Sequence, residues 1–215
     1  MVTTLEAFVD EGAALQDLVN LIKQRTLPCK NQVVVNGDHR FWGVDDTSDI
    51  VRQFREVAIK QYLIHTGAEP RHVIVMANHV SAEASPEGSG GGWHVDSVRN
   101  QYKLFMYLTD CTRCELGPLT LLSLKPLMDR SVIFLNYLTG RKFRFTEASI
   151  QLLKRLGFRP MPMLFPRLKP FFVNTSFIHR GAPITEGERI MLTAYIFDNE
   201  VPDSIAKRAL VNEKE

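Results

Sequence analysis

The residues best suited to chemistry are two histidines and one aspartate. His94 and Asp96 stand two positions apart in the segment Trp93-His94-Val95-Asp96, directly after a glycine-rich run. In a β-strand, positions i and i+2 project from the same face, so this imidazole and this carboxylate would point together into a protein interior. Two histidines and one carboxylate can hold Fe(II) and leave the opposite positions open for a cosubstrate and oxygen. The alternative for the tripeptide alone is a surface ion pair.

The third ligand must come from a distant part of the chain. Of the six histidines, His179 directly follows the predicted strand 171–178 and precedes Arg180 and Gly181. That position predicts a metal ligand at the mouth of a barrel. Arg189 stands ten residues later and opens the last predicted strand, and an arginine can bind a carboxylate through two parallel hydrogen bonds. Arg180 is a rival for this role, although adjacent residues of a strand face opposite ways.

Helices are predicted before the strands that carry these residues. Apolar residues recur at spacings of three and four from Leu5 to Leu21, which indicates a helix with one buried face. A second helix is expected to begin at Thr47 or Ser48 as its N-cap. Between the two helices, 31–43 forms a short β-rich run with a turn at Asn36-Gly37. Residues 1–65 are thus expected to be mainly helical.

Beyond residue 72, β-strands dominate the pattern. Strands are predicted at 72–80, 102–110, 116–124, 171–178 and 189–197, where β-branched and aromatic residues gather. Residues 125–170 interrupt them with a helix over 147–156, which Thr146 caps and Gly157 stops, and after that helix with four prolines, at 160, 162, 166 and 170. The Gly/Ser-rich segment 81–92 is either a lid over the site or a plain connector. This order predicts an α+β fold, with helices packed outside a jelly-roll or barrel.

Composition narrows the class of protein. The chain has 215 residues, 45% of them hydrophobic and 23% charged, which suits one soluble domain with a sizeable core. A net charge of +2 is too small to predict binding to nucleic acid or to a membrane surface. Three cysteines argue against a secreted disulfide scaffold, and neither a signal peptide nor a membrane span is indicated. We expect a soluble cytoplasmic protein.

Three segments together resemble the Fe(II)/2-oxoglutarate-dependent dioxygenase superfamily. They are GGGWHVDSVRNQYKLFMYLTD, LGPLTLL and FFVNTSFIHRGAPITEGERIMLTAYI, and they look most like its phytanoyl-CoA-dioxygenase-like branch. The resemblance covers roughly residues 73–197, with 125–170 as an insertion. It implies one oxygenase domain over 1–215, built as a double-stranded β-helix of the jelly-roll, cupin-like type. Helices in 1–65 would flank this barrel.

The resemblance implies a role for each candidate residue. His94, Asp96 and His179 would hold Fe(II), and Arg189 would pair with the distal carboxylate of the cosubstrate 2-oxoglutarate. The implied reaction uses O2, releases succinate and CO2, and oxidises a C–H bond of a small molecule, most often by hydroxylation. Because Asp96 keeps the carboxylate ligand, this chain is not expected to be a halogenating relative.

Several alternatives stay open beside this assignment. Lys103 and Tyr107 share one face of the predicted strand 102–110, and the resemblance places that face near the cosubstrate. A lysine at the barrel rim and a tyrosine in the core are the competing interpretations. A catalytically silent member of the same superfamily would keep the metal ligands without turnover. An iron oxygenase that does not use 2-oxoglutarate would leave Arg189 without an obvious role.

Overall fold

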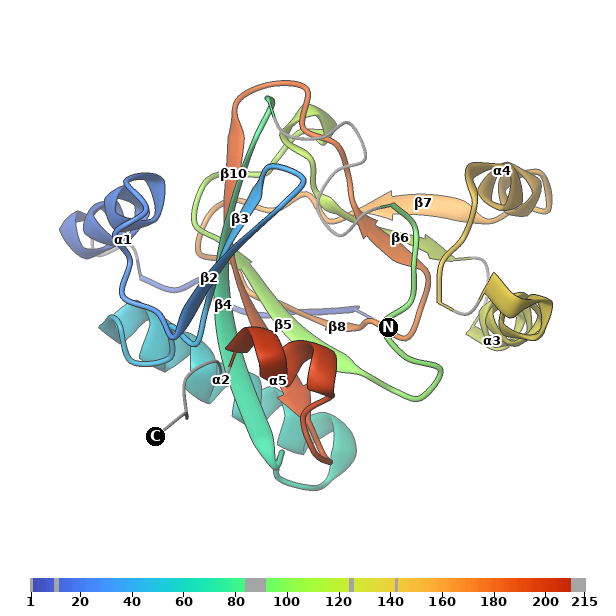
Figure 1. Cartoon of the computed structure of the whole chain (residues 1–215), viewed down its shortest axis with the longest axis horizontal. Coiled ribbons are helices and arrows are strands. Elements are labelled where there is room, and N and C mark those ends of the chain that lie inside the picture. Colours follow the sequence, from blue (N-terminus) through green and yellow to red (C-terminus); the bar gives the residue numbers. More distant parts are fainter. Residues whose placement is uncertain (1, 10–11, 84–91, 124–125, 142, 210–215) are drawn as a thin grey trace.

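Two antiparallel β-sheets form the centre of the molecule (Figure 1). The computed structural model describes residues 2–9, 12–83, 92–123, 126–141 and 143–209. The major sheet has seven strands, in the order β1 (Val2–Thr4), β8 (Phe171–Asn174), β5 (Tyr102–Tyr107), β10 (Glu188–Phe197), β4 (His72–Ser81), β3 (Asp38–Trp42) and β2 (Asn31–Val35). The minor sheet has three, in the order β7 (Arg159–Pro162), β6 (Leu119–Ser123) and β9 (His179–Gly181).

Successive strands alternate between the two sheets, as in a jelly-roll. From β4 the chain passes to an extended segment at 93–96 beside β9, returns to β5, crosses to β6 and β7, and then alternates through β8, β9 and β10. Apolar side chains from both sheets meet between them, including Phe105, Leu121 and Phe171. Among the described residues no strand ladder joins the two sheets, so the predicted barrel is an open sandwich of two sheets.

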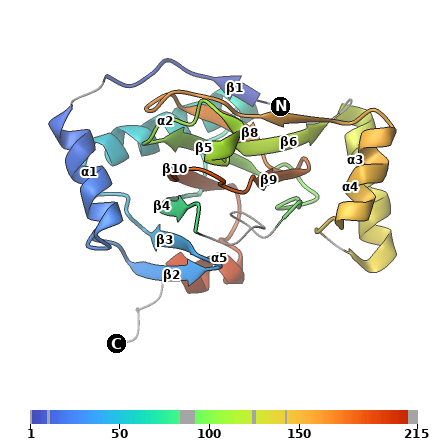
Figure 2. The ribbon, with the colours of Figure 1, turned by 90° about the horizontal axis from the view of Figure 1, so that it is seen from above.

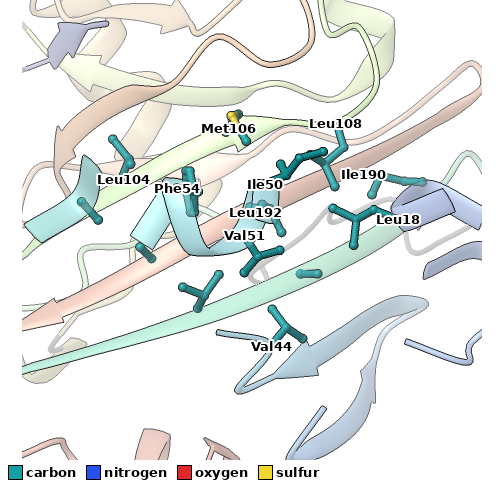
Figure 3. Packing of buried hydrophobic residues seen from close by; sticks show 14 of the residues in the cluster. Leu18, Val44, Ile50, Val51, Phe54, Leu104, Met106, Leu108, Ile190 and Leu192 are labelled. Carbon is teal, nitrogen blue, oxygen red and sulfur yellow. The ribbon is translucent and has the colours of Figure 1, made fainter. Parts of the chain in front are cut away.

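Helices α1 (Ala13–Lys23) and α2 (Asp49–Thr66) cover the outer face of the major sheet (Figure 2). The predicted N-cap of α2 is present, because the Ser48 hydroxyl accepts a hydrogen bond from Val51 N at 3.3 Å. Apolar residues of both helices pack on the alternate residues of β10 that face them (Figure 3). This core cluster includes Leu18, Ile50, Val51, Phe54, Ile190 and Leu192. The opposite residues of β10, starting with Arg189, are left to face the space between the sheets.

The N-terminal region contributes strands as well as helices. β2 and β3 form a hairpin whose turn residues Asn36 and Gly37 have φ angles of 50° and 76°, which suits a two-residue hairpin turn. β3 then pairs with β4, with Arg40 opposite Asn78 and Trp42 opposite Met76. The β-rich run predicted over 31–43 is thus a hairpin of the major sheet, whereas β1 was not predicted and the first helix begins at Ala13, not near Leu5.

The strand predicted over 171–178 is shorter in the structure. β8 ends at Asn174, whose Oδ1 accepts hydrogen bonds from Ser176 N at 3.1 Å and from Ser176 Oγ at 2.7 Å. This side-chain turn redirects the chain. His179 consequently begins β9 in the minor sheet, whereas the sequence placed it at the end of the strand predicted over 171–178.

The insertion 125–170 combines helices with an edge strand. α3 (Pro126–Asn136) runs into a π-helical turn (Tyr137–Arg141), and α4 (Glu147–Arg155) begins at the predicted cap, where Thr146 Oγ1 accepts from Ser149 N at 3.2 Å. Both helices pack on the outside of the minor sheet, and β7 then pairs with β6. Of the proposed lid at 81–92, residues 84–91 lie outside the described residues.

Two short elements were not predicted. A 3₁₀ turn (Cys114–Leu116) precedes β6, and α5 (Asp203–Ala209) lies beside β2, where the Asn31 amide donates to the backbone oxygen of Arg208 at 2.8 Å. Across the described residues, every helix is too short or too polar to cross a membrane.

Candidate metal centre

His94, Asp96 and His179 come together between the two sheets. Their ligand atoms all lie within 4.8 Å of one another. The Nε2 atom of His94 is 3.7 Å from Asp96 Oδ1, and that of His179 is 3.6 Å from Asp96 Oδ2. No other group of three or more His, Cys, Asp and Glu side chains in the described part of the chain is arranged to hold a metal.

Backbone hydrogen bonds position the two histidines. His94 N donates to His179 O at 2.9 Å, and His179 N donates to His94 O at 2.8 Å. The segment 93–96 is therefore extended along β9, although it forms single bridges there instead of a regular strand. Trp93 and Val95 point the other way, into the core under α3 and α4. This alternation brings His94 and Asp96 to the same side, the side that faces the cavity.

Both imidazoles are held by the same local hydrogen bond. Nδ1 of His94 lies 2.9 Å from the carbonyl oxygen of Gly92, and Nδ1 of His179 lies 2.9 Å from that of Phe177. Because a carbonyl oxygen only accepts, each Nδ1 carries the proton and each Nε2 presents a lone pair. Burial, reinforced by the nearby His94, lowers the pKa of His179 to about 3. Burial also lowers the pKa of His94. Neutral imidazoles are the form that binds metals.

Lys103 pairs with the carboxylate of this cluster. Its Nζ lies 2.7 Å from Asp96 Oδ2 and 4.1 Å from the centre of the Tyr195 ring. Burial alone would raise the pKa of Asp96, but the attraction of Lys103 and the histidines outweighs it, so the pKa of Asp96 is lowered. The structure therefore places Lys103 against a candidate metal ligand, next to the cavity in which a cosubstrate would bind.

A cavity of about 320 Å³ opens beside the cluster. One wall is the inner face of β10, where alternate residues line it: Arg189, Met191, Thr193, Tyr195 and Phe197. Phe105 and Leu119 add apolar surface from β5 and β6. The remaining wall comes from β3, β4 and α5, none of which figured in the sequence-based site.

Arg189 is buried in this cavity, where no residue that the structure describes hydrogen-bonds its guanidinium. The residue is 1% exposed, and none of its three guanidinium nitrogens hydrogen-bonds a described residue. An unpaired buried charge is strongly unfavourable, so such a group is normally completed by an anion. The rival Arg180 lies elsewhere, with its guanidinium 4.5 Å from the centre of the Trp93 ring and outside the cavity lining. The geometry thus favours Arg189 as the carboxylate anchor.

The structure does not bring Tyr107 to the cavity. Its hydroxyl donates to Met163 O at 3.1 Å and accepts from Leu119 N at 3.0 Å, and its ring is buried among apolar residues between the sheets. It shares a strand face with Lys103, as expected, but it lies deeper in the core. The placement fits the competing interpretation, a core tyrosine that ties strands together.

Arg40, Trp42 and Arg208 line the cavity and were missed. A signal for the first two exists in the sequence, since Asp38, Arg40 and Trp42 alternate on one face of the hairpin strand. That signal could not be connected to the site without the pairing of β3 with β4.

Comparisons with known proteins show a likeness in structure alone. No protein-family model matches the chain, and no curated protein matches it. The non-heme alpha ketoglutarate dependent epimerase SnoN from nogalamycin biosynthesis aligns over 92% of this chain and 77% of its own, with 13% identity and a TM-score of 0.55. SnoN has also been solved in complex with Fe3+, alpha ketoglutarate and nogalamycin RO.

Two further solved structures align over similar lengths. HygX from Streptomyces hygroscopicus, solved with nickel, 2-oxoglutarate and hygromycin B bound, covers 91% of this chain and 82% of its own at 13% identity and a TM-score of 0.55. An oxidoreductase of the 2OG-Fe(II) oxygenase family from Burkholderia pseudomallei covers 92% and 84% at 11% identity and a TM-score of 0.52. This chain therefore has a fold that it shares with solved iron- and 2-oxoglutarate-dependent oxygenases.

Proposed function

We propose that this protein is a non-haem Fe(II)- and 2-oxoglutarate-dependent dioxygenase that oxidises a C–H bond of a small molecule, with hydroxylation as the proposed outcome. The observation that carries the proposal is Arg189, a buried guanidinium without a hydrogen-bond partner among the described residues, in the same cavity as the His94, Asp96 and His179 cluster. A cation in that position suits a dicarboxylate whose other end reaches the metal.

The donor atoms fit iron. Two neutral imidazoles and one carboxylate converge from one side, and the cavity leaves the opposite side open. The Gly92 and Phe177 carbonyls orient the two rings, so binding requires no change of tautomer. When bound, the iron together with O2 and 2-oxoglutarate supplies the oxidising power, with succinate and CO2 as products.

The chain's own residues hold and shield the reactants. Arg189 would bind the distal carboxylate of 2-oxoglutarate, and Lys103 fixes one oxygen of Asp96. Phe105, Leu119 and Met191 supply apolar lining beside these charged groups, which strengthens the electrostatic contacts by reducing access of water.

An anaerobic titration with Fe(II) and 2-oxoglutarate tests the proposal. We expect the weak visible charge-transfer absorption of an iron–2-oxoglutarate complex in the wild type. His179→Ala should lose the iron, whereas Arg189→Met should keep the iron and lose the absorption at moderate 2-oxoglutarate. Iron binding without that absorption would point to an oxygenase that uses a different cosubstrate, and failure to bind iron would refute the proposal.

Admission of air then separates an enzyme from a binding protein. We expect oxygen-dependent release of succinate from the wild-type complex. Binding of both ligands with no succinate formed would favour the alternative, a catalytically silent metal- and ligand-binding protein of the same fold. Membership of the phytanoyl-CoA-dioxygenase-like branch and a cytoplasmic location stay predictions.

A further inference from the structure

The cavity extends beyond the metal centre to a wall built by β3, β4 and α5. Arg40 and Trp42 reach it from β3, and Asn78 reaches it from β4. The strand registers place these residues on the same inner face as β10, because Arg40 pairs with Asn78 and Asn78 pairs with Met191. β3 is thus the second strand from β10, about 10 Å across the sheet. We call this surface, formed by Arg40, Trp42, Asn78 and Arg208, the β3–α5 wall.

The charges that line the cavity do not balance. Among the described residues, the cavity is lined by one carboxylate, that of Asp96, and by five cationic side chains: Arg40, Lys103, Arg144, Arg189 and Arg208. Arg40 is also ion-paired with Asp38 behind the wall, so the excess of positive charge rests on Arg189 and Arg208 and not on Arg40 or Arg144. Lys103 is paired with Asp96, and Arg189 is assigned to 2-oxoglutarate. A metal ion and a dicarboxylate of opposite charge would leave the excess unchanged. A cavity with this excess attracts an anion.

The guanidinium of Arg40 is oriented by a hydrogen bond to Asp38, on the side away from the cavity. Its Nε donates to Asp38 Oδ2 at 2.7 Å, and Asp38 Oδ1 accepts from the Asn78 amide at 2.9 Å. Asp38 is buried and does not line the cavity. Neither Nη atom of Arg40 forms a hydrogen bond to a residue that the structure describes. A guanidinium fixed through Nε in this way is oriented in advance for a ligand.

Two uncharged groups of the wall also lack partners. Trp42 is 1% exposed, and its Nε1 has no hydrogen-bond partner within the described ranges. The same holds for Oδ1 of Asn78, whose amide nitrogen is used by Asp38. An indole N–H only donates and an amide oxygen only accepts. Unsatisfied buried groups of this kind are rare in folded proteins and call for a ligand or a water molecule.

We propose that the primary substrate is a small polar acid whose carboxylate or phosphate group binds at the β3–α5 wall, near Arg40 and Arg208. An oxygen of the same molecule would accept from Trp42, and a hydroxyl or amino group would donate to Asn78. This inference rests on the proposed function, because it assigns the substrate of the same site. Two anion sites then share one cavity: Arg189 for the cosubstrate, and the β3–α5 wall for the substrate.

Paired probes test the proposal. The Fe(II)-loaded protein, saturated with 2-oxoglutarate under anaerobic conditions, is titrated with a panel of hydroxy- and amino-carboxylic acids and sugar phosphates. Each acid is compared with a matched compound that lacks the anionic group: the methyl ester or amide of a hydroxy acid, the N-acetyl methyl ester of an amino acid, or the unphosphorylated sugar. We expect acids to bind and to stimulate succinate release in air, and the matched neutral compounds to do neither. Comparison of carboxylates with phosphates identifies the anionic group.

Variants locate the site. Arg208→Gln alters an exposed side chain, so the protein should fold, and it should weaken the best acid about tenfold. Trp42→Phe keeps an aromatic ring, smaller than the indole, but removes the N–H donor and should also weaken binding of the acid. Arg113→Gln, an exposed arginine paired with Glu186 away from the cavity, is the matched control and should have no effect.

The outcomes distinguish this inference from the proposed function. Failure of the wild type to bind 2-oxoglutarate would refute both the proposed function and the anionic substrate. Intact 2-oxoglutarate binding, with neutral compounds preferred or with no acid bound, would refute the anionic substrate alone. An acid that binds equally well to wild type, Arg208→Gln and Trp42→Phe would overturn the assignment to the β3–α5 wall.

Discussion

Replacing Arg189 with methionine should stabilise the ligand-free protein and weaken its binding of 2-oxoglutarate. The guanidinium is buried with all three nitrogens unpaired, whereas methionine keeps much of the aliphatic stem and removes the charge. The cost of a buried, unpaired ion amounts to several kcal/mol, and water in the cavity offsets part of it. We expect a net gain of about 1–2 kcal/mol, or about 2–8 °C in Tm for a chain of this size.

The effect on ligand binding has the opposite sign. Removing one partner of a buried charge-assisted pair costs about 2–5 kcal/mol, which weakens 2-oxoglutarate by about 30-fold to several thousand-fold. At a concentration 100 times its Kd, the ligand stabilises the wild type by about 2.7 kcal/mol. The same concentration should stabilise Arg189→Met by less than about 0.9 kcal/mol.

Thermal unfolding followed by circular dichroism measures both effects, with chelator alone and with Ni(II) plus 2-oxoglutarate. Arg180→Met is the matched control, because that arginine lies over Trp93 outside the cavity and should leave the ligand-induced shift unchanged. A ligand-free Arg189→Met protein that is less stable than wild type, yet shows the full shift with 2-oxoglutarate, would show that Arg189 has a structural role instead.

Three other perturbations probe the site. Lys103→Met leaves Asp96 buried without its partner, so the metal-free protein should lose about 3–5 kcal/mol, and Ni(II) should raise its Tm more than that of wild type. The pKa of His179 is lowered from its ordinary value of 6.5 to about 3 in the folded protein. As the pH falls below 6.5, this histidine is therefore protonated in the unfolded chain before it is protonated in the folded protein. Stability should then fall by up to about 1.4 kcal/mol per pH unit between about pH 6.5 and 3, and His179→Asn should reduce this slope in urea titrations. Tyr107→Phe removes a hydroxyl that bonds two backbone groups, so we expect a loss of about 1–3 kcal/mol in urea unfolding with unchanged affinity for 2-oxoglutarate in calorimetry; a weaker affinity would restore Tyr107 as a cosubstrate residue.

Local patterns in the sequence predicted the elements that depend on local physics. The caps at Ser48 and Thr146 are present, since a hydroxyl directly before an apolar helix satisfies a backbone N–H whatever the tertiary context. The alternation of β10 was likewise predictable over 189–197. The break after Asn174 was not, because the polar residues Asn174, Thr175 and Ser176 stand in an otherwise apolar, β-rich run, and the strand ends where Ser176 hydrogen-bonds to the Asn174 side chain.

Residues that reach the site through sheet pairing could not be predicted. The three candidate metal ligands could be predicted because His94 and Asp96 are close in sequence and because His179 lies in a segment that resembles a known family. Arg40 lines the cavity only because β3 pairs with β4, and Arg208 only because α5 lies against β2. Such long-range placements depend on register and packing, which a single sequence does not encode in any local signal.

The metal centre can form only after His94 and His179, which hydrogen-bond to each other through their backbones, have come together during folding. The two residues are 85 positions apart, so their contact closes a long loop and carries the entropic cost of doing so. In the unfolded chain each imidazole is a separate, weak ligand, and iron has no pair of histidines to bridge. We therefore expect the iron proposed for this site to bind after the sheet is complete, so that its binding energy stabilises the native state and not the folding transition state. Removing the metal with a chelator should accordingly speed unfolding while leaving the refolding rate unchanged. Bound metal would then slow the unfolding of the folded protein without guiding its folding.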